Sequence, residues 1–251
     1  MTEVLANLNP LIDGDVLAYS CGFAPGSEIS VENALQATKT KIESLLAAFP
    51  GRSYHKLYLT GKGNFRDKVA TILPYKGNRD PSHKPVFYED IRQYMLDVYD
   101  GDLVEGREAD DALGEEQWKS GKTTCLVGID KDLDMIPGFH YNSKTHRVYY
   151  VNLQEANLNF LRQMLEGDRT DNIPGIRGIG KAKKFKHIPK GMHPNDACRV
   201  VAKFYHSQFK EDCYAAVREI ATLLWIQRGG DADKQLDEFV RRIHEGFPAP
   251  F

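Results

Sequence analysis

The stretch "TTCLVGIDKD", Thr123–Asp132, places a run of strand-forming residues directly before two aspartates. β-Branched and apolar residues packed together predict a buried strand, and the Asp-Lys-Asp that follows predicts its end. A second strand is expected at Leu8–Asp13, which ends on an aspartate before a glycine. In open α/β sheets, ligands bind beyond the carboxyl ends of the strands. The acids after these two strands are therefore the first candidates for chemistry.

The first 150 residues alternate between strand and helix patterns. Apolar residues at a period near 3.6 predict three helices, at 31–49 (capped by Ser30), 87–98 and 108–119. Besides the two strands above, alternating or apolar runs predict three more, at 55–60, 139–141 and 147–151. Strands that alternate with helices predict an α/β fold with a mostly parallel sheet.

The rest of the chain contains no further strand pattern. Residues 61–84 are polar, rich in Gly, Lys and Arg, and without strong periodicity, so a long loop is expected there. From residue 153 onward all patterns are helical, at about 153–166, 194–206, 211–227 and 232–245, with a hairpin at 171–186. We therefore expect an α/β core at residues 1–160 and a helical region at residues 161–251.

Charge is segregated along the chain although its formal sum is only −2. Residues 105–116 are strongly acidic, whereas residues 175–190 hold six Lys or Arg and no acid. A near-neutral sum does not exclude nucleic-acid binding, because local patches set the electrostatic field.

The four cysteines are far apart in the sequence and form no CxxC pair, so a zinc site is not expected. Buried free thiols in a reducing compartment are expected instead. The chain shows no signal peptide and no apolar run long enough to span a bilayer, so we expect a soluble intracellular protein without a membrane partner. The cysteines are Cys21, Cys125, Cys198 and Cys213.

Four groups of acids recur at the ends of predicted elements. Each group alone has an ordinary explanation, because acids cap helices, favour helix starts and occupy solvated turns. If they converge, their repulsion costs several kcal/mol unless a cation is present. Mg²⁺ or Mn²⁺ prefers such oxygen ligands, and two ions about 4 Å apart can clamp a phosphodiester. The groups are Asp13; Glu108, Asp110 and Asp111; Asp130 and Asp132; and Asp168 and Asp171.

A glycine-rich basic hairpin follows the last of these groups, in "GDRTDNIPGIRGIGKAKK" (167–184). Its glycines allow tight turns and close approach of the backbone to another chain, and its lysines extend a positive field that favours phosphate. The alternative is an ordinary connection between helices with a solvated basic face. No strand precedes it, so a dinucleotide-binding fold fits poorly. The candidate DNA-binding residues are Gly175, Gly178, Gly180, Lys181, Lys183 and Lys184.

The loop before residue 80 is also basic, with Tyr75 among its cations. Such a loop fits electrostatic capture of a nucleic-acid backbone, and the aromatic ring could stack on a base. Seen alone, it would more often be a solvated loop. Its cations include Lys62, Arg66, Lys68, Lys76 and Arg79.

Taken together, these segments resemble the 5′-nuclease family, which includes bacteriophage 5′–3′ exonucleases and flap endonucleases and a similar domain of bacterial DNA polymerase I. The similarity is greater to the phage branch and covers most of residues 10–185. The segments in family order are "IDGDVLAY" (12–19), "NFRDKVATILPYKGNRD" (64–80), "READDALG" (107–114), "GIDKDLDMIPG" (128–138) and "GDRTDNIPGIRGIGKAKK" (167–184).

The resemblance implies a PIN-like, three-layer α/β core with an arch-like loop at about 61–95. It also implies a helix-three-turn-helix region that contains a helix-hairpin-helix at 168–186. All eight acids above match the family's metal ligands, which bind two Mg²⁺ or Mn²⁺ ions. Lys76 and Arg79 match basic residues near the scissile phosphate, and Arg66 matches another. Carbonyl groups around Gly175, Gly178 and Gly180 would hold a K⁺ ion.

The implied activity is metal-dependent 5′–3′ exonuclease or flap-endonuclease cleavage of duplex, nicked or 5′-flap DNA, or of RNA primers in hybrids. Its setting would be DNA replication or repair in the cytoplasm of a bacterial host, as a phage-encoded monomer with replication proteins as candidate partners. One position departs from the family, because Gly61 stands where an aspartate is usual. An alternative is therefore a catalytically impaired, structure-specific DNA-binding protein. A further alternative is a related RNA-directed nuclease, against which the duplex-gripping hairpin argues.

Overall fold

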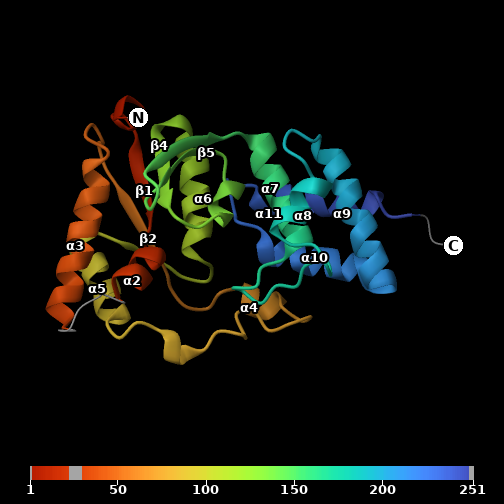
Figure 1. The fold of residues 1–251 in the computed structure, drawn as a ribbon, viewed down its shortest axis with the longest axis horizontal. Coiled ribbons are helices and arrows are strands. Elements are labelled where there is room, and N and C mark those ends of the chain that lie inside the picture. The colour runs from red at the N-terminus through yellow and green to blue at the C-terminus, as the bar shows by residue number, and fades with distance from the viewer. Residues whose placement is uncertain (1, 23–29, 249–251) are drawn as a thin grey trace. The chain divides into compact units, whose positions relative to one another are not determined.

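The computed structural model describes residues 2–22 and 30–248, which form two compact units (Figure 1). The α/β unit comprises residues 1–64 and 80–151, and the helical unit comprises residues 65–79 and 152–251. The expected division at residue 160 therefore differs from the observed one. The helical unit takes a segment from the middle of the α/β sequence, which we call the 65–79 segment.

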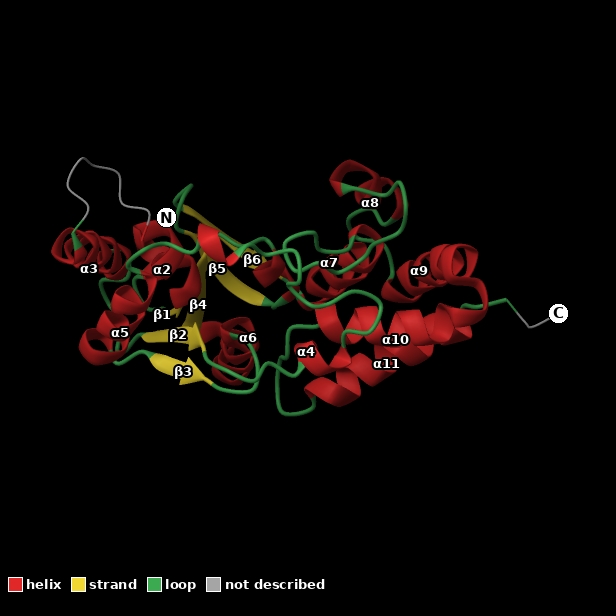
Figure 2. Cartoon of the chain, turned by 90° about the horizontal axis from the view of Figure 1, so that it is seen from below, coloured by secondary structure: helices red, strands yellow, loops and turns green. Residues whose placement is uncertain are grey.

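The α/β unit is built on a six-stranded sheet in the described part of the chain, with strand order β3-β2-β1-β4-β5-β6. Neighbouring strands are parallel except for the β5–β6 pair, which is antiparallel. The expected α/β fold with a mostly parallel sheet is confirmed (Figure 2). The strands are β1 (Asn9–Asp13), β2 (Lys56–Thr60), β3 (Asp102–Val104), β4 (Thr124–Gly128), β5 (Gly138–Asn142) and β6 (Arg147–Val151).

Helices cover both faces of this sheet (Figure 1). On one face, Ile12, Leu57 and Val127 share a buried apolar cluster with Leu45 and Met95 from two helices. Alternate strand residues point to the opposite face, where α6 packs against β1, β2 and β4. The helices of the first face are α2 (Gly14–Gly22), α3 (Val31–Ala47) and α5 (Tyr88–Tyr99), and the opposite face carries α6 (Ala109–Ser120).

Local sequence explains where these elements begin. The Ser30 side chain accepts a hydrogen bond from the amide of Asn33 and caps α3, as expected. The observed strands and helices follow the predicted ranges within a few residues, with exceptions. The helix α2 and the three-residue strand β3 were not expected, since neither shows a clear apolar period. The remaining short elements of this unit are α1 (Thr2–Leu5) and 3-10 turns at Pro81–His83, Gly121–Thr123 and Asp132–Met135.

The helical unit is organised around an aromatic core. Phe160 is fully buried, and its ring meets those of Trp225 and Phe239 edge-on at centroid distances of 4.9 and 5.4 Å. Aromatic pairs in this geometry add stability beyond the apolar area that they bury. The helices are α4 (Arg66–Val69), α7 (Leu153–Glu166), α8 (Lys181–His187), α9 (Pro194–Phe209), α10 (Cys213–Leu224) and α11 (Ala232–Glu245), with a 3-10 turn at Lys210–Asp212.

Hydrogen bonds to α10 fasten the 65–79 segment to the helical unit. Arg66 is only 2% exposed, and its guanidinium donates to the carbonyl oxygens of Leu223 and Trp225 at 2.9 and 2.6 Å. These carbonyls lie at the end of α10, where the helix itself provides no donors. The Glu219 carboxylate accepts from the amides of Thr71 and Ile72, both at 2.7 Å. What appears in the sequence as a structureless loop is therefore held in place by tertiary contacts.

The cysteines are buried and free, as expected. Among the described residues, no helix is both long enough and apolar enough to cross a membrane.

Replacing Phe160 with alanine should lower the free energy of unfolding by about 3–5 kcal/mol, because the change removes a buried ring and leaves a cavity. Urea denaturation followed by far-UV circular dichroism would measure the loss. On the same helix, Leu153 is 48% exposed, so Leu153→Ala is the matched control and should cost less than about 1 kcal/mol. Equal effects of the two substitutions would contradict the packing described for α7.

Candidate functional site

The carboxyl edge of the sheet in the α/β unit gathers several of the predicted acids. Asp13 is the last residue of β1, and Asp130 follows the neighbouring strand β4 by two residues. The strand register pairs Ile12 with Val127, so Asp13 lies beside Gly128. A Cβ atom added at Gly128 would lie 3.9 Å from Oδ2 of Asp13. The fold thus brings together two acids that are more than 100 residues apart in the sequence.

The electrostatics of this edge show which carboxylates interact. Burial, followed by the charges of Asp15 and Asp130, raises the pKa of Asp13 to about 7, although the amide of Val16 donates to Oδ1. Burial also raises the pKa of Asp110 well above its usual value, with further contributions from Asp13, Glu108, Asp130 and Asp111. Each group resists ionisation mainly because it is buried, and further because its neighbours are acids. Asp13, Asp110 and Asp130 therefore lie close enough for their charges to interact, whereas the convergence of all eight acids stays a prediction.

Some of the predicted acids also have an ordinary structural role. Glu108 and Asp111 form a capping box at the start of α6, in which Oδ2 of Asp111 accepts from the amide of Glu108 at 3.2 Å. Asp111 has no exposed surface. Oδ1 of Asp130 accepts from the amide of Asp132 at 2.9 Å and shapes the turn after β4. The assignment of Asp111 and Asp132 as metal ligands stays a prediction.

The donor chemistry of this edge fits a hard divalent cation. Asp13, Glu108, Asp110 and Asp130 offer oxygen ligands, and a cation would offset the mutual repulsion that raises the pKa values of Asp13 and Asp110. In the part of the chain that the structure describes, however, no three Asp, Glu, His or Cys side chains are already arranged to ligate one ion. The acids would have to approach one another more closely when an ion binds.

Around Gly61, another carboxylate fills the space of the missing aspartate. A Cβ atom at Gly61 would lie 2.8 Å from both Cδ and Oε1 of Glu105, and 2.8 Å from the carbonyl oxygen of Val104. Oε2 of Glu105 accepts from the amide of Lys62 at 2.8 Å. Glu105 therefore occupies the place that a side chain at position 61 would take.

Asp15 is the other acid near this position, and it is engaged elsewhere. Oδ1 of Asp15 accepts from Arg92 at 2.6 Å, and Oδ2 accepts from the amide of Thr60 at 3.0 Å. The hydroxyl of Thr60 in turn accepts from the amide of Ala109 at 2.9 Å. Asp15 thus helps to fasten the end of β2, and Arg92 balances its charge.

In the helical unit, Asp168 shapes the turn that precedes the hairpin. Oδ1 of Asp168 accepts from the amide of Thr170 at 2.7 Å and from that of Asp171 at 3.3 Å. The backbone groups of Asp168 and Ile173 also pair across the turn. The ordinary explanation that the sequence left open for Asp168 was a cap of the next helix, whereas its side chain stabilises a turn. Its role as a metal ligand stays a prediction.

Asp171 contacts two of the predicted phosphate-binding cations. Its Oδ1 accepts from Arg79 at 2.6 Å, its Oδ2 accepts from the hydroxyl of Tyr75 at 2.7 Å, and Nζ of Lys76 lies 3.7 Å from Oδ2. Arg66, the third predicted catalytic cation, is instead buried against the end of α10. This burial disfavours direct contact between Arg66 and a phosphate.

The predicted hairpin has the close packing and turns that its glycines suggested. A Cβ atom at Gly175 would lie 2.1 Å from the carbonyl oxygen of Glu166, so only glycine fits. Gly178 has a φ of +81°, which favours glycine. Gln208 of α9 accepts from the amide of Arg177 at 2.7 Å and donates to the carbonyl of Gly175 at 3.2 Å. The hairpin backbone is therefore tied to α9.

The hairpin lysines differ in their surroundings. Lys183 donates through Nζ to the carbonyl of Gly178 at 2.8 Å, and Lys184 pairs with Glu166 of α7. Lys181 is exposed. Two carbonyls of the predicted K⁺ site, those of Gly175 and Gly178, thus already accept side-chain donors. The K⁺ site stays a prediction.

Sequence reasoning missed several residues that support these sites. Tyr75 was expected to stack on a base, whereas its hydroxyl bonds to Asp171 and its side chain is largely buried. Glu105 lies in the acidic stretch that the sequence singled out, but nothing there linked it to Gly61. Arg92 and Gln208 act through contacts with residues more than 30 positions away, so no local signal pointed to them.

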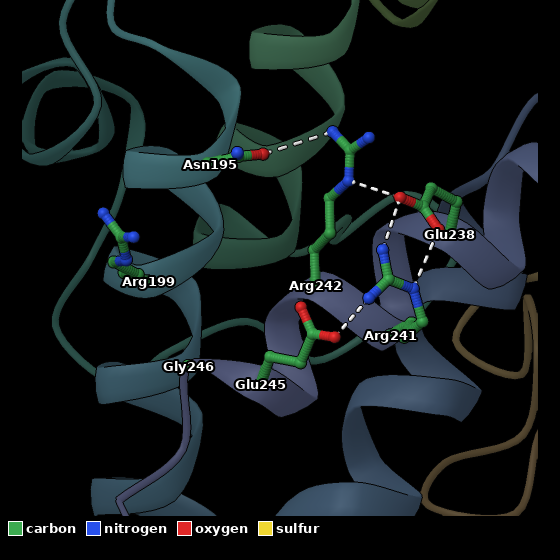
Figure 3. A pocket seen from close by; sticks show the side chains of 7 residues that line it. All are labelled: Asn195, Arg199, Glu238, Arg241, Arg242, Glu245 and Gly246. Carbon is green, nitrogen blue, oxygen red and sulfur yellow. Dashed lines mark hydrogen bonds and ion pairs between the residues drawn. The ribbon is translucent and has the colours of Figure 1, made fainter.

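A pocket of about 290 Å³ lies at α9 and α11 of the helical unit (Figure 3). Glu238 accepts from both Arg241 and Arg242, and Arg242 also donates to Asn195 at 3.2 Å. The hydrogen bonds from Arg241 and Arg242 lower the pKa of Glu238 to about 2. Because these arginines already have acidic partners, we interpret the pocket as a surface ion-pair network that joins the two helices.

Comparison with known proteins identifies relatives of this chain by sequence. No protein-family model matches the chain. A DNA polymerase I of Chloroflexus aurantiacus is 27% identical in an alignment 280 positions long, which covers 93% of this chain and 27% of the polymerase. The chain therefore spans about a quarter of the length of this curated relative.

Solved structures are similar in fold to nearly the whole chain. A bacteriophage T5 flap endonuclease, in a complex with DNA and metal ions, has a TM-score of 0.61 and 17% identity over 94% of this chain and 98% of its own. The expected resemblance to the 5′-nuclease family is confirmed. Human GEN1 in complex with Holliday junction DNA has a TM-score of 0.54 and 13% identity over 95% of this chain and 62% of its own. At these identities the solved structures support the fold rather than individual residue roles.

Replacing Asp13 with asparagine should stabilise the metal-free protein at high pH. Because the pKa of Asp13 is about 7 in the folded state and 3.8 ordinarily, the folded state holds an additional proton between these values. Wild-type stability should therefore fall as pH rises from 4 to 7 and stay low above 7. Asp13→Asn lacks this penalty, so we expect a gain of roughly 2–4 kcal/mol at pH 8 and little change at pH 4.

Urea unfolding in a chelator at pH 4, 6 and 8 would measure this effect. The exposed Asp90 of α5 supplies a matched control, since Asp90→Asn removes the same charge from the surface of the same unit. If Asp13→Asn and Asp90→Asn changed the free energy of unfolding with the same dependence on pH, the burial and crowding described for Asp13 would be contradicted.

Proposed function

We propose that this chain is a metal-dependent phosphodiesterase that cuts DNA near 5′ ends, as a 5′–3′ exonuclease and flap endonuclease. The crowding of Asp13, Glu108, Asp110 and Asp130 at one edge of the sheet carries this proposal. Buried like charges are costly, and strongly perturbed carboxylates of this kind concentrate at functional sites. The likeness to a flap endonuclease with bound DNA and metal ions supports the same activity.

Each of these acids has a definable role in the proposed reaction. Asp13 and Asp110, which resist ionisation in the absence of a cation, would hold the divalent ion together with Glu108 and Asp130. A bound Mg²⁺ or Mn²⁺ ion would lower the pKa of a water molecule and stabilise the negative charge on the leaving oxygen. Lys76 and Arg79 would donate hydrogen bonds to the phosphate as its negative charge develops. Asp111 and Asp132 are proposed as further ligands, and Asp111 would also hold the start of α6 through its capping box.

The hairpin would bind the duplex through its backbone rather than its bases. Lys181 and Lys183 provide positive charge beside a glycine turn, and contacts of this type carry no sequence information. We further propose two metal ions per site with Asp168 among their ligands, and a K⁺ ion at the carbonyls of the hairpin. Nicked and 5′-flap DNA are the proposed substrates, with RNA primers in hybrids as a further class.

Replication or repair is the proposed setting of this activity, in the cytoplasm of a bacterial host and with replication proteins as partners. The phage branch of the family is the proposed origin, and a monomer the proposed state.

A second function, structure-specific binding without cleavage, is favoured by one observation. An acid at position 61 would require both the carbonyl of Val104 and the carboxylate of Glu105 to shift, because they occupy the space of its side chain. If the site needs an acid at that position, the protein would bind branched DNA without cutting it. Cleavage assays with Mg²⁺ and with Mn²⁺ distinguish the two functions.

Replacing Asp130 with asparagine should reduce cleavage of a labelled 5′-flap duplex at least a hundredfold, because the site loses one of its crowded carboxylates. Asparagine can still accept the hydrogen bond from the amide of Asp132, so the turn after β4 should persist. Asp132→Asn should likewise reduce cleavage, and both variants should retain duplex binding. Gel electrophoresis of flap and nicked substrates would follow the products, with Asp90→Asn as the control. Full turnover by both variants would refute the assignment.

The double substitution Lys181→Ala and Lys183→Ala should weaken binding to every duplex sequence by about tenfold. It should also reduce the slope of log affinity against log salt by roughly 1 to 2, since fewer counterions are released. Fluorescence anisotropy at several salt concentrations would measure both quantities. The matched control is Lys39→Ala with Lys41→Ala on α3, where Lys39 is exposed and Lys41 is half-buried. A salt slope equal to that of the wild type would exclude the hairpin as a DNA-binding element.

A further inference from the structure

Asp171 joins the 65–79 segment to the turn that precedes the hairpin. Besides the bonds of its carboxylate, its carbonyl accepts from the amide of Lys76 at 2.9 Å. On one side of it, Asn78 donates to the carbonyl of Arg169 at 2.6 Å. On the other side, Asn172 donates to the carbonyl of Pro74 at 2.8 Å. Two stretches of the helical unit that lie about 90 residues apart are thus joined through side chains and backbone together.

The backbone of Lys76 shows that this contact determines its conformation. Lys76 has a φ of +54°, in the left-handed region that non-glycine residues rarely adopt. Such a conformation persists where the surrounding structure holds it, and it occurs often at functional sites. The hydrogen bond from the Lys76 amide to Asp171 provides that hold. The direction of the Lys76 side chain therefore depends on Asp171.

The side chain of Arg79 is oriented by the same carboxylate. One of its terminal nitrogens donates to Oδ1 of Asp171 at 2.6 Å, while the side chain as a whole remains 43% exposed. Planar guanidinium groups carry five N–H donors, so a group fixed along one edge can still meet a phosphate with another. Asp171 thus limits the rotation of Arg79 and leaves part of it facing solvent.

Tyr75 completes the arrangement from the buried side. Its side chain is only 9% exposed, and its hydroxyl donates to Oδ2 of Asp171 at 2.7 Å. A phenol adds no charge, so it fixes the carboxylate without neutralising it. Both oxygens of Asp171 are therefore engaged, and binding a metal ion through this carboxylate would break bonds that hold Tyr75 and Arg79.

We infer that Tyr75 and Asp171 are positioning residues, which orient Lys76 and Arg79 toward the phosphate that is cut. The inference rests on the proposed function and deepens it, since it gives Asp171 a role other than metal ligand. Small displacements of a catalytic group cost large factors in rate while leaving binding nearly unchanged. The defect expected from disturbing this arrangement is therefore in the cleavage step.

The test is Tyr75→Phe, which removes one hydroxyl and keeps the ring. Single-turnover cleavage of a 5′-flap duplex should slow at least tenfold, with the dissociation constant for DNA within twofold of the wild type. The matched control is Tyr205→Phe in the same unit, where a buried hydroxyl donates to the carbonyl of Met164 at 2.9 Å. That control should lose comparable thermal stability and keep the wild-type cleavage rate.

Three further measurements separate positioning from metal binding. The Nε–Hε resonance of Arg79 in NMR spectra of the DNA-free protein should shift in Tyr75→Phe and stay in place in Tyr205→Phe. Asp171→Asn should slow cleavage at least tenfold and keep the dissociation constant for Mn²⁺, measured by calorimetry, within twofold of the wild type. In a background that carries both Lys76→Ala and Arg79→Ala, adding Tyr75→Phe should slow cleavage by less than twofold, since both groups being positioned are absent.

The possible failures are distinguishable. If the wild type cuts no DNA in Mg²⁺ or Mn²⁺, the proposed function fails. If the wild type cuts and Tyr75→Phe cuts equally fast, or the Arg79 resonance does not move, the inference is overturned while the function stands. A tenfold or greater loss of Mn²⁺ affinity in Asp171→Asn would assign Asp171 as a metal ligand and also overturn it.

Discussion

Repulsion between carboxylates is the constraint on which the α/β unit depends. Strand register brings Asp13 beside the end of β4, and the first turn of α6 adds Glu108 and Asp110 to the same edge. No apolar core would favour this arrangement, because burial raises the cost of every charge. The surrounding structure tolerates it through extensive packing of the sheet between α2, α3 and α5 on one face and α6 on the other. The packing of helices on both faces of the sheet thus offsets the free energy that the carboxylate repulsion costs.

The helical unit holds the polar and basic 65–79 segment in one conformation. Arg66 meets the carbonyls at the end of α10, Glu219 meets the amides of Thr71 and Ile72, and Asp171 meets Tyr75 and Arg79. Each anchor pairs a charged side chain with groups that a helix end or a loop leaves unpaired. With such anchors the segment needs little apolar surface of its own. Arg79 is thus partly exposed and still held by its bond to Asp171.

The sequence predicted elements whose residues carry their own periodicity. The pattern at 232–245 matches α11, and the acids after β1 and β4 were recognised because the carboxyl edge of a parallel sheet is a known place for ligands. The short edge strand β3 was missed, since three residues cannot show an alternation. The docking of the 65–79 segment was missed because it depends on hydrogen bonds across more than 90 residues of sequence. The capping role of Asp111 and the buried hydroxyl of Tyr75 likewise become visible only when tertiary partners are known.

The crowding around Gly61 makes substitutions at neighbouring strands interdependent. An aspartate at position 61 would meet the carboxylate of Glu105 and, more seriously, the carbonyl of Val104, which already accepts from the amide of Gly61 at 2.7 Å. Removing Glu105 would clear only the first obstacle, because the second belongs to the backbone of β3. An acid at this position would therefore require the backbone of the edge strand to move as well. Position 61 itself carries no acid, but the carboxylate of Glu105, which directly follows β3, lies beside it.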